Sequence, residues 1–263
     1  MRYLPIENVS LFIRRMYSYT YLLASFYIIR SIYRFSDYAS HYMIEHKWLD
    51  ISPSKLEKIE ECVYSSIHSI LCTSMASWSM SKSMIEDPWN PLSLTLHEFP
   101  QNNQLQLFTT TFSLTYFMMD LAKCVYHRKY MFILHHLAAI HLLYHGLGSF
   151  SQNDSKGFYI MNFLFLLESN TVLLNTGYLL KEMGFHYSIT CTSWIIHLFI
   201  FISFRLIMIP KLILIYYMYE GITLRSLMML PSFALIWMGS VYWSYRQILG
   251  IQKYIKESSH RNS

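Results

Sequence analysis

The chain has 263 residues, of which 53% are hydrophobic and only 14% are charged. A soluble domain carries charges at roughly a quarter of its positions, so this composition argues against a soluble protein and predicts helices that cross a membrane several times. The formal net charge is +5, but no cluster of Lys and Arg exceeds two or three residues. That distribution argues against a nucleic acid as partner.

The N-terminal segment, residues 1–54, contains an apolar stretch from Leu11 to Phe35. Its uncharged core, Met16–Ile29, is shorter than the roughly 20 apolar residues that a spanning helix needs. Arginines flank this core, and their long side chains can reach the membrane interface. Both a signal-anchor span and an interfacial helix fit the stretch. A polar connection follows, and Ser52-Pro53-Ser54 predicts the start of a helix.

Six apolar stretches then predict six membrane-spanning helices within residues 55–255. They are Glu61–Met80, Leu105–Tyr126, Tyr130–Leu147, Phe158–Leu180, Tyr187–Tyr219 and Leu227–Leu249. The fifth is too long for one straight crossing of a membrane about 30 Å thick, and Pro210 predicts a kink within it. A basic polar tail, residues 256–263, ends the chain. The predicted fold is all-α and polytopic, with six helices plus the N-terminal one.

Basic residues gather in alternate connections between these helices and in the tail. They are Lys55, Lys58, Arg128, Lys129, Lys181, Arg246, Lys253 and Lys256. The connections on the other side hold the acids Glu86, Asp87, Glu98 and Asp154. Because loops rich in Lys and Arg stay on the cytosolic side, we expect the basic turn at residues 127–129 and the C-terminus in the cytosol.

The second and third predicted helices carry the most unusual ionisable groups. Asp120 stands deep in the apolar run of one, and His135 and His136 are adjacent in the other. Counted from the turn between the helices, Asp120 and His135 lie at matching depths, so an acid and an imidazole can meet. Such a contact fixes the tautomer of a histidine and raises its basicity, as in general-base catalysis. A buried polar clamp between two helices is the other interpretation.

Further ionisable groups stand inside the later helices. Glu168 shares a helix face with Thr171 and Asn175, and His197 shares one with Arg205. A pair of Glu168 with either His197 or Arg205 would neutralise a buried charge. Structural pairing and contact with a bound lipid or substrate both stay open for these residues.

No metal site is expected. The cysteines have no paired spacing and stand in or beside apolar runs, as reduced thiols do; they are Cys62, Cys72, Cys124 and Cys191. His141 and His145 match one histidine box of the membrane di-iron enzymes. However, Phe132 stands where the His135-His136 pair would need a third histidine, and no later box follows.

The order of these motifs resembles one family of membrane proteins. Tyr116-Phe-Met-Met-Asp120, Arg128-Lys129 and Phe132-Ile-Leu-His135-His136 are similar to parts of the TLC domain. That domain is shared by translocation-associated membrane proteins, longevity-assurance ceramide synthases and the neuronal ceroid lipofuscinosis membrane protein. Weaker similarities follow in the same order across residues 55–255: Ser65–Ser69, Leu167–Asn170, Leu174-Asn175, Phe204-Arg205, Ile209-Pro210, Ile236-Trp237 and Tyr242-Trp243.

The resemblance implies a six-helix bundle that encloses a lipid-sized cavity, usually in the endoplasmic reticulum. In the ceramide-synthase branch, paired histidines and a downstream His-Asp pair transfer an acyl group from acyl-CoA to a sphingoid base. This sequence keeps His135 and His136, but it has Glu168-Ser169-Asn170 in place of the downstream pair. The chain therefore looks more similar to the TLC members linked to lipid sensing, lipid transport or control of membrane composition.

Two functions from different classes follow from the resemblance. The first is a multi-pass protein of the endoplasmic reticulum that binds a lipid or acyl chain and acts in lipid homeostasis. The second is an N-acyltransferase in which His135 or His136 is the base or acyl acceptor, Asp120 orients the imidazole, and acyl-CoA docks beside Arg128 and Lys129. No other cofactor is expected. A proton-coupled transporter is a third interpretation, but the sequence shows no inverted repeat.

Overall fold

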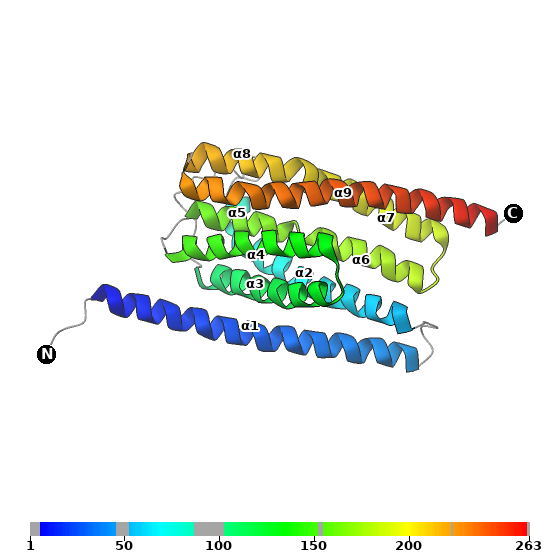
Figure 1. Ribbon diagram of the computed structural model, residues 1–263, viewed down its shortest axis with the longest axis horizontal. Coiled ribbons are helices and arrows are strands. Elements are labelled where there is room, and N and C mark those ends of the chain that lie inside the picture. Colours follow the sequence, from blue (N-terminus) through cyan, green and yellow to red (C-terminus); the bar gives the residue numbers. More distant parts are fainter. Residues whose placement is uncertain (1–5, 46–52, 87–102, 152–154, 222, 262–263) are drawn as a thin grey trace.

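The computed structural model describes residues 6–45, 53–86, 103–151, 155–221 and 223–261 (Figure 1). Within these residues every regular element is helical: α1 (Ile6–Glu45), α2 (Pro53–Glu86), α3 (Asn103–Tyr126), α4 (Tyr130–Ser151), α5 (Ser155–Leu166), α6 (Ser169–Glu182), α7 (Tyr187–Phe201), the π-helix η1 (Ile202–Met208), α8 (Ile209–Glu220) and α9 (Leu224–Arg261). The all-α fold predicted from the sequence is confirmed. α2 begins at Pro53, inside the predicted helix-start signal.

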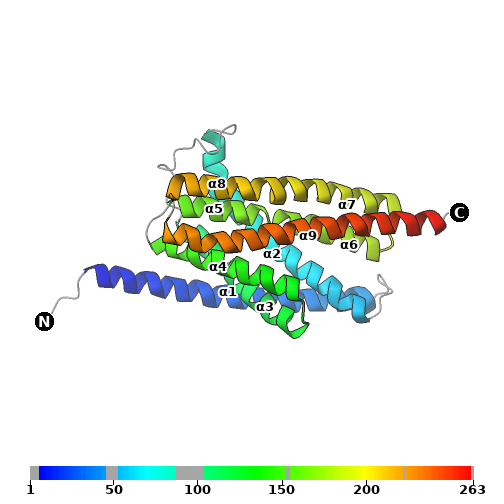
Figure 2. The same ribbon diagram turned by 45° about the horizontal axis from the view of Figure 1, so that its top comes forward.

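The helices run back and forth along one long axis and form a bundle (Figures 1 and 2). α5 and α6 continue one another, and α7, η1 and α8 form a second continuous rod, so the described segments make seven rods. The α3–α4 turn, the α6–α7 turn and the C-terminus lie toward the same end of the bundle. We call it the basic end, because it carries Arg128, Lys129 and Lys181.

Three helices in the described part of the chain are long and apolar enough to cross a membrane. They are Met161–Glu182, Tyr187–Leu214 and Ser226–Lys256, and they correspond to the last three spans predicted from the sequence. The first three predicted spans lie in α2, α3 and α4. Those helices carry many polar side chains that are buried inside the bundle, such as His68, Thr109, Thr111, Ser113 and His136. Their crossing of the membrane stays a prediction.

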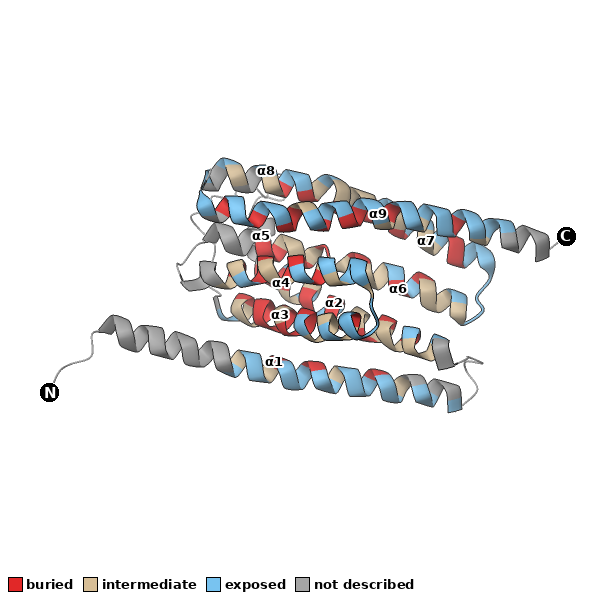
Figure 3. Cartoon of the chain, viewed as in Figure 1, coloured by how far each residue is buried: buried red, intermediate tan, exposed pale blue. Residues whose placement is uncertain are grey.

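Two apolar clusters form the core of the bundle. The first contains side chains from each of the five helices α1, α2, α3, α4 and α5. The second contains side chains from α4, α8 and α9. Leu143 of α4 belongs to the first cluster and Leu142 to the second, so α4 connects both. Buried and exposed positions alternate along α4 and α9, whereas most described positions of α1 are exposed (Figure 3). Since lipid is as apolar as this core, close packing and hydrogen bonds between helices hold the bundle together.

The N-terminal segment forms one long helix, α1, with 40 residues. At 1.5 Å per residue it is about 60 Å long, which exceeds the thickness of a membrane. α1 lies beside α3 and along the bundle axis, and not across its end (Figures 1 and 2). This placement favours the spanning alternative over the interfacial one.

Pro210 stands in the first turn of α8, directly after the π-helix η1. A proline has no N–H, so the carbonyl oxygen four residues earlier, that of Leu206, loses its helical donor. Trp237 of α9 supplies the missing donor, because its Nε1–H donates to Leu206 O at 3.1 Å. The sequence predicted a disturbance of the helix at Pro210, in the form of a kink. In the structure the π-helix η1 comes directly before this proline, and Trp237 of α9 bonds to the carbonyl oxygen of Leu206.

A second irregularity separates α5 from α6 at Leu167 and Glu168, where the N–H of Glu168 bonds to the carbonyl three residues back. Side chains of other helices reach the carbonyl oxygens at this break. Thr73 donates to Phe165 O at 3.4 Å, and Arg205 donates to Leu167 O at 3.5 Å. Irregular backbone at membrane depth is tolerated where neighbouring groups satisfy it in this way.

Candidate functional site

The turn between α3 and α4 holds the two helices antiparallel. The N–H of Lys129 donates to Cys124 O at 2.9 Å, and Arg128 between them adopts φ 56°. Residues other than glycine rarely adopt this left-handed backbone conformation. The tight turn brings the inner faces of α3 and α4 into register, so that groups a few residues from it on either side face each other.

Asp120 and His136 meet across this hairpin. Nε2 of His136 lies 2.7 Å from Oδ2 of Asp120, and Nδ1 lies 2.5 Å from the carbonyl oxygen of Phe132. His136 is buried, and Asp120 is half-buried. The sequence placed Asp120 at the depth of His135, but the histidine that contacts Asp120 in the structure is the adjacent His136.

Both ring nitrogens of His136 have partners. Nε2 contacts the carboxylate of Asp120 in α3, and Nδ1 contacts the carbonyl oxygen of Phe132 in α4. These two contacts fix the orientation of the His136 ring, and neither of its nitrogens is free for a substrate.

His135 has a different environment. Its ring meets the edges of Trp243 and Phe117, with centroids 5.1 and 6.3 Å apart, and its Nδ1 is buried without a hydrogen-bond partner among the described residues. Of the two adjacent histidines, His135 is therefore the one with a ring nitrogen available to a bound molecule. The sequence could not separate their roles, because adjacent side chains point about 100° apart around a helix and the sequence does not show how α4 is rotated toward its neighbours.

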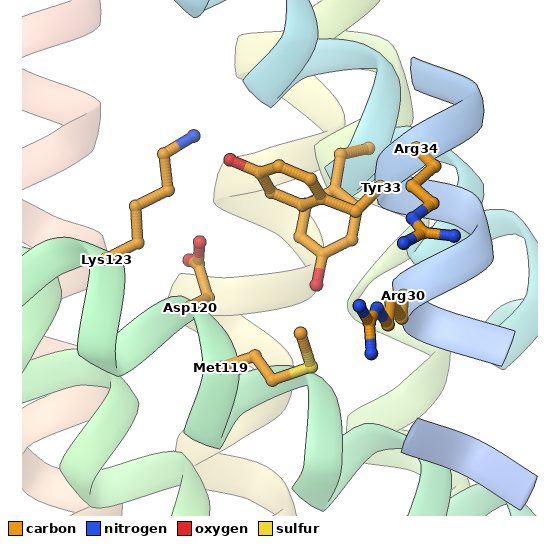
Figure 4. A pocket seen from close by; sticks show the side chains of 7 residues that line it. Arg30, Tyr33, Arg34, Met119, Asp120 and Lys123 are labelled. Carbon is orange, nitrogen blue, oxygen red and sulfur yellow. The ribbon is translucent and has the colours of Figure 1, made fainter. Parts of the chain in front are cut away.

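A pocket of about 370 Å³ opens between α1, α2 and α3. Asp120 lines it, so the acid that pairs with His136 also faces this space (Figure 4). Of the lining residues, only Asp120 was predicted from the sequence; the others are Arg30, Tyr33, Arg34, Tyr64, Met119 and Lys123. Three of these come from α1, and nothing in the sequence indicated that α1 packs beside Asp120.

The basic turn, which the sequence offered as a docking place for acyl-CoA, is largely neutralised by α2. Nζ of Lys129 lies 2.6 Å from Glu61, and Nε2 of His127 lies 3.2 Å from Glu57. Arg128 is exposed at the tip of the turn. Of the two residues predicted to bind the substrate phosphates, only Arg128 lacks an acidic partner in the described structure.

Glu168 and Arg205 form an ion pair deep in the bundle. Nη2 of Arg205 lies 3.2 Å from Oε1 of Glu168, and Thr171 approaches the other carboxylate oxygen at 3.4 Å. Glu168 lies at the α5–α6 break, and Arg205 lies in η1. Of the two pairings that the sequence left open for Glu168, the structure contains the one with Arg205.

Asn175 and His197, also named as candidate binding residues, tie helices together. Nδ2 of Asn175 in α6 donates to Cys62 O at 3.0 Å and to Ser65 Oγ at 2.7 Å, both in α2. Nδ1 of His197 in α7 lies 2.6 Å from the amide nitrogen of Gln247 in α9. In the structure, therefore, both side chains link neighbouring helices: Asn175 links α6 to α2, and His197 links α7 to α9.

His141 and His145, the isolated histidine box, also bond within the bundle. Their Nε2 atoms lie 3.1 Å apart, and Nδ1 of His141 lies 2.8 Å from Ser232 Oγ of α9. The two histidines therefore share one face of α4, and through His141 that face contacts α9.

Asp120, Cys124 and His136 offer three ligand atoms within 4.8 Å of one another. Ligand atoms around a tetrahedral zinc ion lie about 3.3 Å apart, given bonds of about 2.0 Å. The 2.7 Å contact between Asp120 and His136 is too short to admit an ion between them. In this arrangement the two residues fit a shared hydrogen bond better than a metal ion. All four cysteines are buried free thiols.

The sequence pattern of the TLC domain matches residues 58–249, which is most of the chain. The chain belongs to the TLC-domain family. Membership, together with the apolar helices, makes it an integral, multi-pass membrane protein. The TLC domain thus covers α2 to α9 down to Leu249, and α1 lies outside it. No curated protein and no solved structure matches the chain.

Proposed function

We propose that this TLC-domain protein binds a lipid or acyl chain at its helical bundle and acts in lipid homeostasis. The observation that carries the proposal is the pocket between α1, α2 and α3, with Asp120 in its wall. Its volume is at the lower end of the roughly 300–1,000 Å³ of small-molecule sites. Such a space suits a lipid head group or part of one acyl chain.

The position of the pocket supports a lipid as occupant. Lys123, one of its lining residues, stands in the last turn of α3, so the pocket is near the basic end of the bundle. Met119 and the two tyrosine rings add apolar and amphipathic surface. Tyrosine is favoured where a membrane meets water. A site with polar groups at the interface and apolar groups below it matches the two halves of a lipid.

A substitution in the pocket wall tests the proposal. Met119→Trp places an indole in the pocket, and Met118→Trp places the same group on the neighbouring, exposed position as a matched control. Each purified protein would be washed in lipid-free detergent and its retained lipids extracted and quantified. We expect wild type and Met118→Trp to retain similar amounts and Met119→Trp to retain several-fold less. Equal retention by all three proteins would remove the pocket as the binding site.

The second candidate function is acyl transfer, and the environment of the paired histidines favours it. Asp120 and His136 form a hydrogen-bonded pair, and His135 beside it keeps a buried nitrogen without a partner among the described residues. In an acyltransferase, His135 would act as base or acyl acceptor, and the Asp120–His136 pair would position it or supply a proton. This assigns different tasks to the two histidines.

An acyl-transfer assay separates the two candidate functions. Purified protein would receive a sphingoid base and acyl-CoAs of several chain lengths, with His135→Ala and His136→Ala as variants. If the chain is an enzyme, product forms, and His135→Ala abolishes it while the variant still elutes as a folded protein. If no chain length gives product but lipid co-purifies, the binding function stands alone. Product formed equally by His135→Ala would contradict the assignment of His135.

The proposed location is the membrane of the endoplasmic reticulum, with the basic end and the C-terminus in the cytosol. The basic connections named from the sequence meet at one end of the bundle (Figure 1), as the positive-inside rule requires of cytosolic loops.

A further inference from the structure

We propose that the pocket between α1, α2 and α3 selects lipids whose head group carries an anionic phosphate or carboxylate, and that Arg30 and Arg34 bind this group. The inference rests on the proposed lipid binding and names its chemical class. Arg30 and Arg34 stand four residues apart on α1, which places them on one face of that helix. Both line the pocket, as Figure 4 shows.

The charges around the pocket leave an unbalanced positive patch. Three cations and one acid line it. The acid, Asp120, is bonded to His136, and the cation Lys123 lies 3.4 Å from Glu61. Arg30 and Arg34 have no ion pair among the described residues. Two guanidinium groups close to a membrane require a counter-charge, and an anionic lipid supplies one.

The nearest acid along α1 does not cancel this charge. Asp37 stands one turn beyond Arg34, and its Oδ1 lies 3.5 Å from Nε2 of His41. The Asp37 carboxylate thus has a partner of its own in His41, and it makes no ion pair with Arg30 or Arg34 in the described structure. The two guanidinium groups therefore keep their donors for a molecule that enters the pocket.

A buried hydroxyl adds a neutral donor to the same site. Tyr64 of α2 is only 4% exposed, yet it lines the pocket, and its OH has no hydrogen-bond partner among the described residues. An unpartnered buried hydroxyl is costly, so it calls for an acceptor. A phosphate or carboxylate accepts several hydrogen bonds at once, and the planar guanidinium forks match its oxygen atoms. Two arginines and one tyrosine thus offer donors from two helices.

An apolar stripe leads away from the arginines along α1. Phe26 and Leu23 stand four and seven residues before Arg30, on the same face of the helix, and both are exposed. They lie farther from the basic end, in the direction of the membrane centre. A head group held by the arginines would place its acyl chains along this stripe. Free phosphate would make no use of it, which is why we infer a lipid as the source of the anion.

The test compares an anionic lipid, a neutral lipid and the free anion. Full-length protein in a neutral detergent would be titrated separately with phosphatidic acid, phosphatidylcholine and inorganic phosphate while its thermal unfolding is measured. The test variant is Arg30→Gln/Arg34→Gln. The control variant, Lys211→Gln/Arg246→Gln, removes the same charge from two exposed positions on α8 and α9. Size-exclusion chromatography would establish that both variants are folded.

We expect phosphatidic acid to raise the unfolding temperature of wild type and control at concentrations at least ten-fold below those of phosphatidylcholine. The arginine variant should lose this preference and respond to both lipids alike. An unchanged preference in the arginine variant would overturn the proposal. So would an equal loss in the control variant, which would show a general effect of charge. If inorganic phosphate stabilises wild type as strongly as phosphatidic acid, the site takes a free anion and not a lipid.

Met119→Trp distinguishes failure of this inference from failure of the proposed function. If that variant loses the response to both lipids but Arg30→Gln/Arg34→Gln keeps the preference, the pocket binds lipid without selecting its charge. If Met119→Trp leaves both responses intact, the pocket is not the lipid site, and both proposals fail together.

Discussion

Glu168 and Arg205 meet at 3.2 Å in the interior of the bundle, at two positions where the helices depart from regular geometry. A charge inside a membrane protein is tolerated when a partner or a free backbone carbonyl satisfies it. Arg205 has both, since it also donates to Leu167 O at the α5–α6 break. The ion pair and the irregular backbone therefore support each other, and removing one charge leaves the other exposed to an apolar environment.

A substitution series at this pair gives the first prediction. Glu168→Leu leaves Arg205 buried without a counter-charge, and we expect it to lower the free energy of unfolding by about 3–5 kcal/mol. Glu168→Leu/Arg205→Met removes both charges at similar volume and should lose clearly less. Unfolding by titration with a denaturing detergent, followed by circular dichroism, measures both. If the double variant is as unstable as Glu168→Leu, the unpaired charge of Arg205 is not the cause of the lost stability, and the prediction is wrong.

The sequence predicted part of this residue-scale arrangement. Counting residues from the α3–α4 turn placed Asp120 at the depth of His135, but the histidine that contacts Asp120 is the adjacent His136. A residue count gives the depth of a side chain and not its direction around the helix, so it could not show which of the two histidines faces α3. That choice depends on how α4 is rotated about its axis, which is fixed by packing such as that of Phe132 and His135 on Trp243 of α9.

At the scale of helices, the rod formed by α7, η1 and α8 shows how a proline is accommodated. Pro210 deprives Leu206 of a donor, and Trp237 donates to the carbonyl oxygen of Leu206 from a different helix. The sequence predicted a disturbance at Pro210, since the missing N–H is a local property. It did not predict the π-helix, because that form depends on partners that α9 and the α5–α6 break provide.

The second prediction separates these two contributions. Trp237→Phe removes the indole donor and should lower the free energy of unfolding by about 0.5–1.5 kcal/mol, the usual net contribution of one hydrogen bond, because this bond lies at an exposed position of the bundle. Pro210→Ala restores a backbone N–H four residues after Leu206. We therefore expect Pro210→Ala/Trp237→Phe to be more stable than Trp237→Phe alone, as measured by thermal unfolding. If the proline substitution gives no recovery, the tryptophan stabilises the bundle by packing and not by its hydrogen bond.

At the scale of the whole molecule, α1 adds a lateral pocket to the TLC domain. The family match begins at residue 58, so α1 is an addition to the TLC domain. It contributes Arg30, Tyr33 and Arg34 to the pocket beside Asp120. The sequence indicated an apolar N-terminal helix but not its neighbours, because its short uncharged core suits an interfacial position as well as a spanning one. Contact between α1 and α3 is a tertiary property that no local pattern encodes.

The distribution of charge over the whole bundle leads to the third prediction, which concerns orientation. The described α3–α4 and α6–α7 turns lie toward the basic end, whereas the α8–α9 turn lies at the other (Figure 1). If the basic end faces the cytosol, a cysteine at Met183 in the α6–α7 turn is cytosolic, and one at Leu224 at the start of α9 is lumenal. Both positions are exposed, and the four native cysteines are buried.

Labelling of sealed microsomes with a membrane-impermeant maleimide tests this orientation. We expect Met183→Cys to react in intact microsomes and Leu224→Cys to react only after the membrane is permeabilised. The unsubstituted protein measures the background from its buried thiols. The reverse pattern would place the basic end in the lumen, and acyl-CoA from the cytosol could then not reach Arg128. Because the α1–α3 pocket lies near the basic end, the same result would make it a site for lipids of the lumenal leaflet.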